Sequence, residues 1–115
     1  MNSYDSLKKN RDFQNVYKNG KSKANKYLVM YVLENQLDSN RLGISVSKKV
    51  GNSVVRSRVT RLIRESYRLK EEFIDQPGWD FVIIARSNAN NATYNDITDS
   101  LEQLLKQQKI FNKNS

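Results

Sequence analysis

The sequence predicts an α+β protein built as a two-layer sandwich of helices on a sheet. Two observations support this fold class. Segments with helical spacing of apolar residues alternate with dense runs of β-branched and aromatic residues, and their order is helix, two or three strands, helix, strand, helix. The 115 residues suffice for one core and leave no room for a second. We therefore expect a single domain over residues 1–115, with flexible ends at about 1–8 and 112–115.

The first half of the chain contains one expected helix and two expected strands. The helix is predicted to begin near Asn10, an acceptable cap, and to end at Gly20 as the residue just beyond its last turn. Residues 27–33 are a dense β-type run, and residues 41–47 alternate apolar with polar side chains. Turn-forming residues 38–40 lie between the two runs. These strands are therefore expected to form an antiparallel hairpin with a long loop.

The second half continues with a helix over about residues 53–70 and a turn at residues 76–78. A second dense strand follows at residues 79–85, and its centre is apolar enough to be buried on both faces. The last helix is predicted to begin after Thr93 as its N-cap. Asp96, three residues later, completes a capping-box arrangement, and an apolar stripe then runs along one face of this helix.

Composition limits the chemistry that the chain can perform. Histidine and cysteine are both absent, which excludes a disulfide framework, a thiolate zinc site, a thiol nucleophile and a histidine base. No apolar run approaches the ~20 residues that cross a bilayer. Residues 1–9 lack the apolar core of a signal peptide. We therefore expect a cytoplasmic protein without a membrane partner.

The charge of the chain is strongly positive and unevenly distributed. There are 20 Lys and Arg against 12 Asp and Glu, which gives a net charge of +8. Residues 48–68 contain seven of the basic residues and only one acidic residue, Glu65, so this stretch alone carries +6. A concentrated patch of this kind favours a polyanionic partner such as nucleic acid. The alternative is a soluble domain that is basic for no specific reason.

Projected at 100° per residue, the helix over residues 53–70 has two distinct faces. One face is apolar and comprises Val55, Val59, Leu62 and Ile63. The opposite face carries Arg61, Arg64 and Arg68 with Ser57 and Thr60 among them, while Arg56 and Arg58 fall on opposite flanks. An ordinary amphipathic surface helix is the alternative, but such helices usually mix charges of both signs. Arginine with almost no acidic counter-charge favours phosphate binding.

The loop before this helix adds a second feature that suits anions. Lys48 and Lys49 precede Gly51, which permits a tight loop, and Asn52 or Ser53 can cap the helix. The free N–H groups at a helix N-terminus bind anions, and the two lysines would reinforce this effect. We therefore expect phosphate groups at the start of the helix as well as along its arginine face.

From residue 41 to residue 65 the sequence resembles the signature of the bacterial ribonuclease P protein family. Further similarity lies in residues 12–17 with Gly20 and in residues 81–86, so the resemblance covers nearly the whole chain. It implies the element order αβββαβα, a central mixed and mostly antiparallel sheet, and a left-handed β-α-β crossover, as in the ribosomal protein S5 domain 2-like fold. Because general rules favour a right-handed crossover, this feature is implied by the resemblance alone.

The family motif in the basic helix is Arg-Asn-Arg, one apolar residue, then Lys-Arg. Arg56, Arg58 and Arg61 match this motif. Ser57 stands at its Asn position and Thr60 at its Lys position. Ser57 retains a hydroxyl that can hydrogen-bond phosphate or sugar, whereas Thr60 lacks the positive charge of lysine.

The resemblance also implies two RNA-binding surfaces. The arginine-rich helix and its preceding loop would contact the catalytic RNA of ribonuclease P. The residues assigned to this contact are Lys48, Lys49, Asn52, Arg56, Ser57, Arg58, Thr60, Arg61, Arg64 and Arg68. A shallow cleft between the first helix and the sheet would hold the single-stranded 5′ leader of precursor tRNA, with Phe13, Tyr17 and Tyr31 as its aromatic residues. Without the resemblance, Phe13 and Tyr17 lie one helical turn apart and a core role is favoured.

The implied reaction is hydrolysis of one phosphodiester bond, which removes the leader and leaves a 5′-phosphate on the mature tRNA. The RNA subunit would perform the chemistry and hold most of the Mg²⁺. No catalytic residue and no metal ligand is therefore assigned to the protein. The protein is expected to be monomeric outside the holoenzyme and to have no DNA partner.

Two other functions stay open at this point. A ribosomal-protein-like structural RNA-binding domain without a catalytic role explains the charge and the basic helix equally well. A metal-dependent nuclease that acts without an RNA subunit would need several converging carboxylates. The acidic residues of this chain are instead dispersed, and none clusters in the basic region.

Overall fold

Five strands form one sheet in the order β1-β4-β5-β3-β2 in the computed structural model, which describes residues 4–74 and 77–110. The strands are β1 (Tyr4–Ser6), β2 (Lys21–Ala24), β3 (Leu28–Glu34), β4 (Asn40–Ser45) and β5 (Trp79–Ala85). The helices are α1 (Asn10–Asn19), α2 (Ser53–Lys70) and α3 (Tyr94–Gln107), with short 3₁₀ turns η1 (Glu71–Phe73) after α2 and η2 (Ser87–Asn91) after β5. The predicted order αβββαβα is confirmed, with β1 added before α1.

Strand β5 lies at the centre of the sheet, so the predicted hairpin of the strands at 27–33 and 41–47 is wrong. β5 lies between β3 and β4, antiparallel to β3 and parallel to β4. The apolar sequence of β5 suits this central position, because side chains of a central strand are buried on both faces of the sheet. Turn residues at 38–40 mark a reversal of the chain and do not determine which strand pairs next. The outer edge of β3 pairs with β2 instead.

The N-terminal segment takes part in the sheet, although the sequence predicted a flexible end over residues 1–8. β1 pairs in parallel with β4. The N–H of Leu7 donates to the carbonyl oxygen of Leu42 at 2.8 Å, and the Leu7 side chain is buried. A three-residue strand is too short to show an alternating pattern in the sequence. Residues 1–3 of the predicted flexible N-terminal end, the expected flexible end at 112–115 and part of the predicted turn at 76–78 lie outside the described residues.

The start signals of α2 and α3 are confirmed. Helix α2 begins after Asn52, whose side-chain oxygen accepts the N–H of Val55 at 3.0 Å. Helix α3 begins after Thr93 with a full capping box. The Thr93 hydroxyl accepts the N–H of Asp96, and the Asp96 carboxylate accepts the N–H of Thr93, which lowers the pKa of Asp96.

Both ends of α1 differ from the prediction in detail. The cap position is Lys9, whose side chain makes no capping hydrogen bond, and Asn10 is the first helical residue. Gly20 follows the helix in an extended conformation (φ −81°), not in the left-handed one that the prediction implied. Glycine suits this position for a steric reason, because a Cβ there would lie 2.6 Å from the carbonyl oxygen of Val16.

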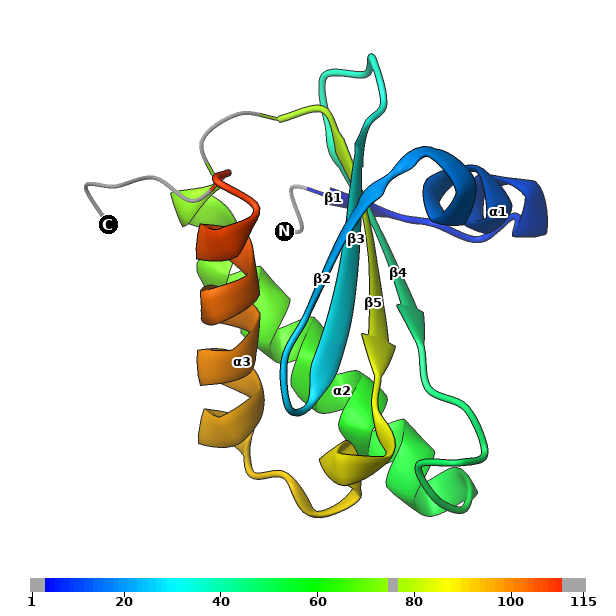
Figure 1. The fold of residues 1–115 in the computed structure, drawn as a ribbon, viewed down its shortest axis with the longest axis vertical. Coiled ribbons are helices and arrows are strands. Elements are labelled where there is room, and N and C mark those ends of the chain that lie inside the picture. The colour runs from blue at the N-terminus through cyan, green and yellow to red at the C-terminus, as the bar shows by residue number, and fades with distance from the viewer. Residues whose placement is uncertain (1–3, 75–76, 111–115) are drawn as a thin grey trace.

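The helices cover the two faces of the sheet unequally (Figure 1). Helices α2 and α3 lie on one face and enclose the main core, to which Ile63 of α2, Leu101 of α3 and Phe81 of β5 contribute fully buried side chains. Helix α1 covers part of the opposite face. A smaller apolar cluster around Val16 and Val82 lies beneath it. The predicted layer of helices on a sheet is thus confirmed, with α1 added on the far side.

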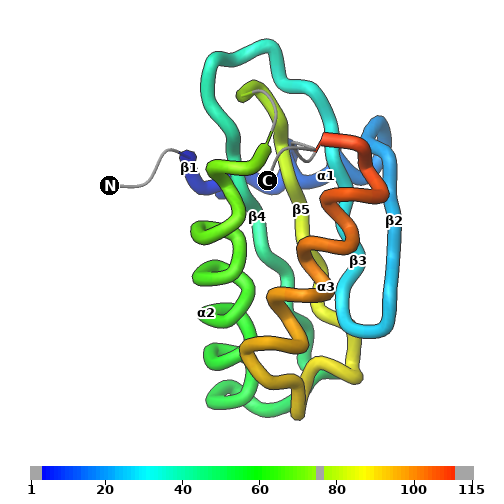
Figure 2. The backbone as a smooth tube through the Cα atoms, turned by 90° about the vertical axis from the view of Figure 1, so that its left-hand side faces the viewer, coloured from blue at the N-terminus to red at the C-terminus, as the bar shows by residue number. Residues whose placement is uncertain are grey.

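The connection from β4 through α2 to β5 is the left-handed crossover that the resemblance implied. In Figure 2, α2 and α3 lie in front of the sheet, and β4 and β5 both run downward as a parallel pair. β5 lies to the right of β4 in this view. A right-handed connection would place it to the left. The loop of residues 46–52 joins the end of β4 to the start of α2 at one end of the sheet (Figure 2).

Candidate nucleic-acid interface

Helix α2 separates its apolar and basic residues as the sequence predicts. Val59, Ile63 and Tyr67 on its inner face are fully buried. Arg61, Arg64 and Arg68 on its outer face are exposed. The helix is therefore held by its apolar face against the sheet and α3, while the guanidinium groups of the outer face lie in solvent. This face of Arg61, Arg64 and Arg68, together with the exposed Ser57 one turn before Arg61, is called the arginine face below.

No arginine of the arginine face forms an ion pair among the described residues. Of the ion pairs found there, the one that involves α2 joins Lys70 to Glu102 of α3 at 2.8 Å, and none includes an arginine of α2. Glu65, the acidic residue that lies among these arginines in the sequence, is exposed and belongs to none of these pairs. Like charges on one helix repel each other. A face of this kind suits a polyanion that neutralises it.

The two flanking arginines of α2 occupy different environments. The Nη2 of Arg58 donates to the carbonyl oxygen of Ala92 at 2.7 Å and so ties α2 to the segment that leads into α3. Arg56 lies on the other flank, where its Nε is buried without a hydrogen-bond partner among the described residues. Their predicted placement on opposite flanks is confirmed. The internal partner of Arg58 is a tertiary contact that the sequence does not reveal.

The loop between β4 and α2 presents two further basic side chains. Lys48 and Lys49 are exposed. The turn is closed by the N–H of Val50, which donates to the carbonyl oxygen of Ser47 at 3.0 Å, and Val50 itself is buried. The side chain of Asn52 serves as the helix cap, so its oxygen already has a partner. The two lysines therefore extend the arginine face to the start of α2.

Phe13, Tyr17 and Tyr31 come together on the opposite face of the sheet. The ring centroids of Phe13 and Tyr17 are 6.3 Å apart, and those of Tyr17 and Tyr31 are 5.2 Å apart in an edge-to-face arrangement. All three are half-buried and pack against the small apolar cluster beneath α1. Burial raises the pKa of the Tyr17 hydroxyl above its usual range. This aromatic row combines core packing with exposed ring surface.

Gly43 of β4 allows α1 to approach the sheet closely at the end of this row. A Cβ at Gly43 would lie 2.6 Å from the Phe13 ring, so any larger residue would displace Phe13. The Phe13 ring thus rests on the backbone of β4, whereas Tyr17 contacts Tyr31 of β3. The aromatic row spans the sheet from β4 to β3 under α1.

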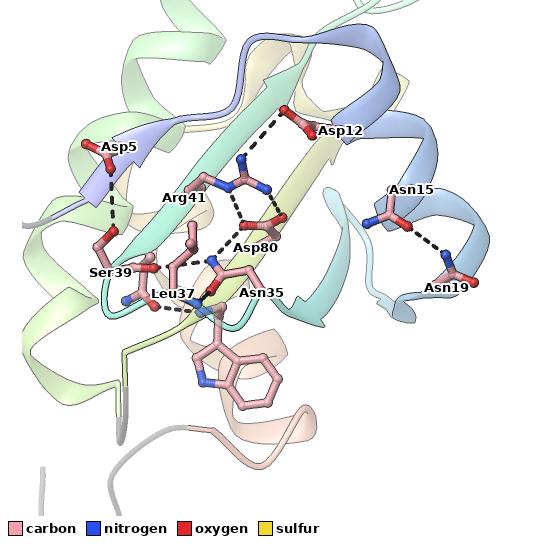
Figure 3. A network of polar contacts seen from close by, with 11 residues as sticks. Asp5, Asp12, Asn15, Asn19, Asn35, Leu37, Ser39, Arg41 and Asp80 are labelled. Carbon is pink, nitrogen blue, oxygen red and sulfur yellow. Dashed lines mark hydrogen bonds and ion pairs between the residues drawn. The ribbon is translucent and has the colours of Figure 1, made fainter.

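A polar cluster that the sequence reasoning missed fixes α1 to the sheet (Figure 3). Asp80, only 1% exposed, accepts hydrogen bonds from Arg41 Nε at 2.8 Å, from Arg41 Nη2 at 2.6 Å and from Asn35 Nδ2 at 2.8 Å. The Nη1 of Arg41 also lies 3.6 Å from a carboxylate oxygen of Asp12 in α1. The hydrogen bonds to Asp80 raise the pKa of Arg41. The sequence feature that could have indicated this cluster is Asp80 itself, an aspartate inside the otherwise apolar strand β5.

The described residues contain no group of three or more His, Cys, Asp or Glu side chains that could hold a metal ion. Within the same part of the chain, no helix is long and apolar enough to cross a membrane.

A mixed sheet with a basic, solvent-facing helix on one side and an aromatic row on the other defines a small α+β protein of the RNA-binding class. The model of one family, Ribonuclease P, matches residues 1–109. The chain belongs to the ribonuclease P protein family. It is therefore similar to the protein component of a ribonucleoprotein hydrolase that processes tRNA, and its partner is the ribonuclease P RNA.

Individual relatives support this assignment. The ribonuclease P protein component of Lachnoclostridium phytofermentans is 60% identical over 107 residues, which cover 93% of this chain and 91% of the relative. That of Clostridioides difficile is 54% identical over 90% of this chain and 91% of its own. The structure of the Staphylococcus aureus protein matches with a TM-score of 0.85 and 45% identity over 93% and 97% of the two chains. The Thermotoga maritima protein matches with a TM-score of 0.80 and 33% identity over 90% and 96%.

Proposed function

We propose that this protein assists removal of the 5′ leader from precursor tRNA by binding two RNAs at once. The arginine face and Lys48 and Lys49 bind the catalytic RNA. The aromatic row of Phe13, Tyr17 and Tyr31 binds the single-stranded leader. The observation that carries this proposal is that the arginine face is exposed and has no ion-pair partner among the described residues.

The arginine face acts by neutralising phosphate charge. Each guanidinium that contacts a phosphate releases condensed counterions and reduces the repulsion between two RNA chains that must lie close together. Exposed arginines also form bidentate hydrogen bonds to phosphate oxygens. The rigid inner face of α2 keeps these arginines at fixed spacing, so RNA binding does not first require the helix to order.

The aromatic row acts on bases. Leader nucleotides are unpaired, and unpaired bases stack on exposed aromatic rings with little dependence on sequence. Because mature tRNA has no leader, this contact favours the precursor over the product. The protein thereby adds binding energy to the substrate complex and performs no bond-breaking step itself.

The chemistry lies on the RNA subunit in this proposal, with Mg²⁺ held mainly there. The side chains of the described residues offer no cluster of carboxylates fit to hold a pair of such ions. No step is therefore assigned to a metal on this protein. Its role is confined to charge neutralisation, positioning and substrate preference.

The direct test combines the purified protein, a bacterial ribonuclease P RNA and a 5′-labelled precursor tRNA at low Mg²⁺. We expect cleavage at the mature 5′ end only when RNA and protein are both present. Failure of the protein to bind this RNA or to change its cleavage would leave a general structural RNA-binding domain. Cleavage by the protein without RNA would indicate a protein nuclease.

The role of the aromatic row is tested with Tyr17→Ala. We expect affinity of the holoenzyme for precursor tRNA to fall by about 1–2 kcal/mol because one stacking surface is lost, while affinity for mature tRNA stays unchanged. Tyr17→Phe, which keeps the ring, is the matched control and should behave as the unaltered protein. Equal losses for precursor and mature tRNA, or no effect of shortening the leader, would remove the leader from this surface.

A further inference from the structure

A groove runs between the end of β4 and the first turns of α2, beside the arginine face. Ile44 and Val46 form its apolar wall, and Arg56, Ser57, Thr60 and Arg64 form its polar wall. Its volume of about 440 Å³ lies within the roughly 300–1,000 Å³ range of sites that hold small ligands. Phosphate binding along a helix needs only the polar wall. The apolar wall suits a group that is flat or aliphatic.

The polar wall contains hydrogen-bond donors that lack partners. The Nε of Arg56 is buried and without a hydrogen-bond partner among the described residues, a state that costs free energy unless an acceptor completes it. Arg64 is exposed and belongs to none of the ion pairs found in the described ranges. The Thr60 hydroxyl already donates to the backbone carbonyl of Arg56 at 2.8 Å. Arg56 and Arg64 therefore line the groove with no hydrogen bond or ion pair among the described residues that holds their guanidinium groups elsewhere, and Thr60 mainly sets the width of the groove.

Ser53 and Ser57 lie between this groove and a second one on the arginine face, and they line both. The second groove, also about 440 Å³, is otherwise lined by Val54, Arg58 and Arg61. An RNA backbone that follows the arginine face therefore crosses a small, hydroxyl-bearing residue at the point where it can enter the groove. Ser57 is short enough to let a nucleotide turn inward.

We propose that the groove binds one unstacked nucleotide of the catalytic RNA. Arg56 and Arg64 hold its phosphate, and its base or ribose lies against Ile44 and Val46. This proposal rests on the proposed function and adds to it. The surface around the arginine face would then neutralise phosphate charge and also select a local RNA shape. RNA offers such bases in loops and bulges, where they are free to turn out of a stack.

The test compares two variants that add the same charge. Thr60→Lys fills the groove, whereas Leu69→Lys adds a lysine to the same helix at a position that is 50% exposed and lines neither groove. If charge alone governs binding, both variants bind the catalytic RNA as tightly as the unaltered protein or more tightly. A nucleotide in the groove predicts that Thr60→Lys weakens RNA binding at least fivefold while Leu69→Lys does not. Equal affinity of the two variants would overturn the proposal.

A second measurement does not depend on how Thr60→Lys folds. The methyl NMR signals of Ile44 and Val46 in the unaltered protein are followed while adenosine 5′-monophosphate is added, with inorganic phosphate as control. We expect both residues to shift with the nucleotide and not with phosphate. No shift with the nucleotide, or the same shift with phosphate, would contradict the proposal. If the unaltered protein fails to bind the catalytic RNA at all, the proposed function falls, and the NMR result still decides whether the groove accepts a nucleotide.

Discussion

The arginine face of α2 and the aromatic row beneath α1 differ in what holds their side chains in place. The arginines extend into solvent from a helix whose inner side is fully buried, and they make no ion pair among the described residues. The aromatic rings are themselves part of an apolar cluster, and the helix that carries two of them is fixed by the Arg41–Asp80 cluster. The arginine side chains therefore contribute little to the packing of the fold, whereas the aromatic side chains are part of that packing.

This difference determines how each surface responds to mutation. Substitution of an exposed arginine removes a binding group and leaves the packing unchanged, so RNA affinity should fall while the free energy of unfolding stays the same. Substitution near the aromatic row changes packing and binding together. The predictions below use this contrast, from the largest expected effect to the smallest.

Arg41→Ala should have the largest effect on stability. It removes two hydrogen bonds and the charge that neutralises the buried carboxylate of Asp80. We expect the free energy of unfolding to fall by about 3 kcal/mol in urea denaturation at neutral pH. Arg11→Ala, at an exposed position of α1, is the matched control and should change it by less than about 0.5 kcal/mol. A loss below about 1 kcal/mol for Arg41→Ala would mean that this cluster does not hold α1.

Arg58→Ala should reveal that the arginines of α2 are not equivalent. Because Arg58 donates to the carbonyl oxygen of Ala92, its loss should lower the free energy of unfolding by about 1 kcal/mol. Arg61→Ala serves as the comparison and should leave unfolding unchanged while weakening RNA binding. The same unfolding curve for both variants would show that the contact with Ala92 contributes nothing measurable.

Glu102→Gln should have a small effect that depends on pH. The Glu102 carboxylate accepts from Lys70 at 2.8 Å and pairs with Lys106 at 3.1 Å, and the hydrogen bond from Lys70 contributes most to lowering its pKa. A carboxyl with a lowered pKa in the folded state stabilises the fold above its unfolded pKa of about 4.3 and loses this contribution as pH falls through its folded pKa. At pH 7 the free energy of unfolding of the unaltered protein should exceed that of the variant by a few tenths of a kcal/mol. This difference should shrink toward pH 3, and a difference that grows on acidification would contradict the assignment.

Local signals in the sequence predicted the elements that depend on local chemistry. The limits of α2, the burial of β5 and the capping box of Thr93 and Asp96 follow from periodicity and capping, which act within a few residues. The pairing of β5 between β3 and β4 depends on competition among strands far apart in the chain. Turn residues could not reveal its outcome. Strand β1 was missed because it is too short for any period to appear.

The candidate site shows the same division between local and tertiary information. The exposure of Arg61 and Arg64 followed from their angular position on the helix. The contact of Arg58 with Ala92 and the cluster around Asp80 join residues more than 30 positions apart, so no local pattern could indicate them. No local pattern indicated the groove beside Arg56 either, because its apolar wall lies at the end of β4 and just after it, whereas its polar wall lies on α2.

The central claim is that the arginine face binds the phosphates of the catalytic RNA. It is tested most directly by the salt dependence of RNA affinity for the unaltered protein and for Arg64→Ala. We expect the variant to bind about fivefold more weakly at low salt and the slope of log affinity against log salt concentration to fall in magnitude by about 0.7–1, as for the loss of one phosphate contact. An unchanged affinity and an unchanged slope would show that this face does not contact RNA phosphate.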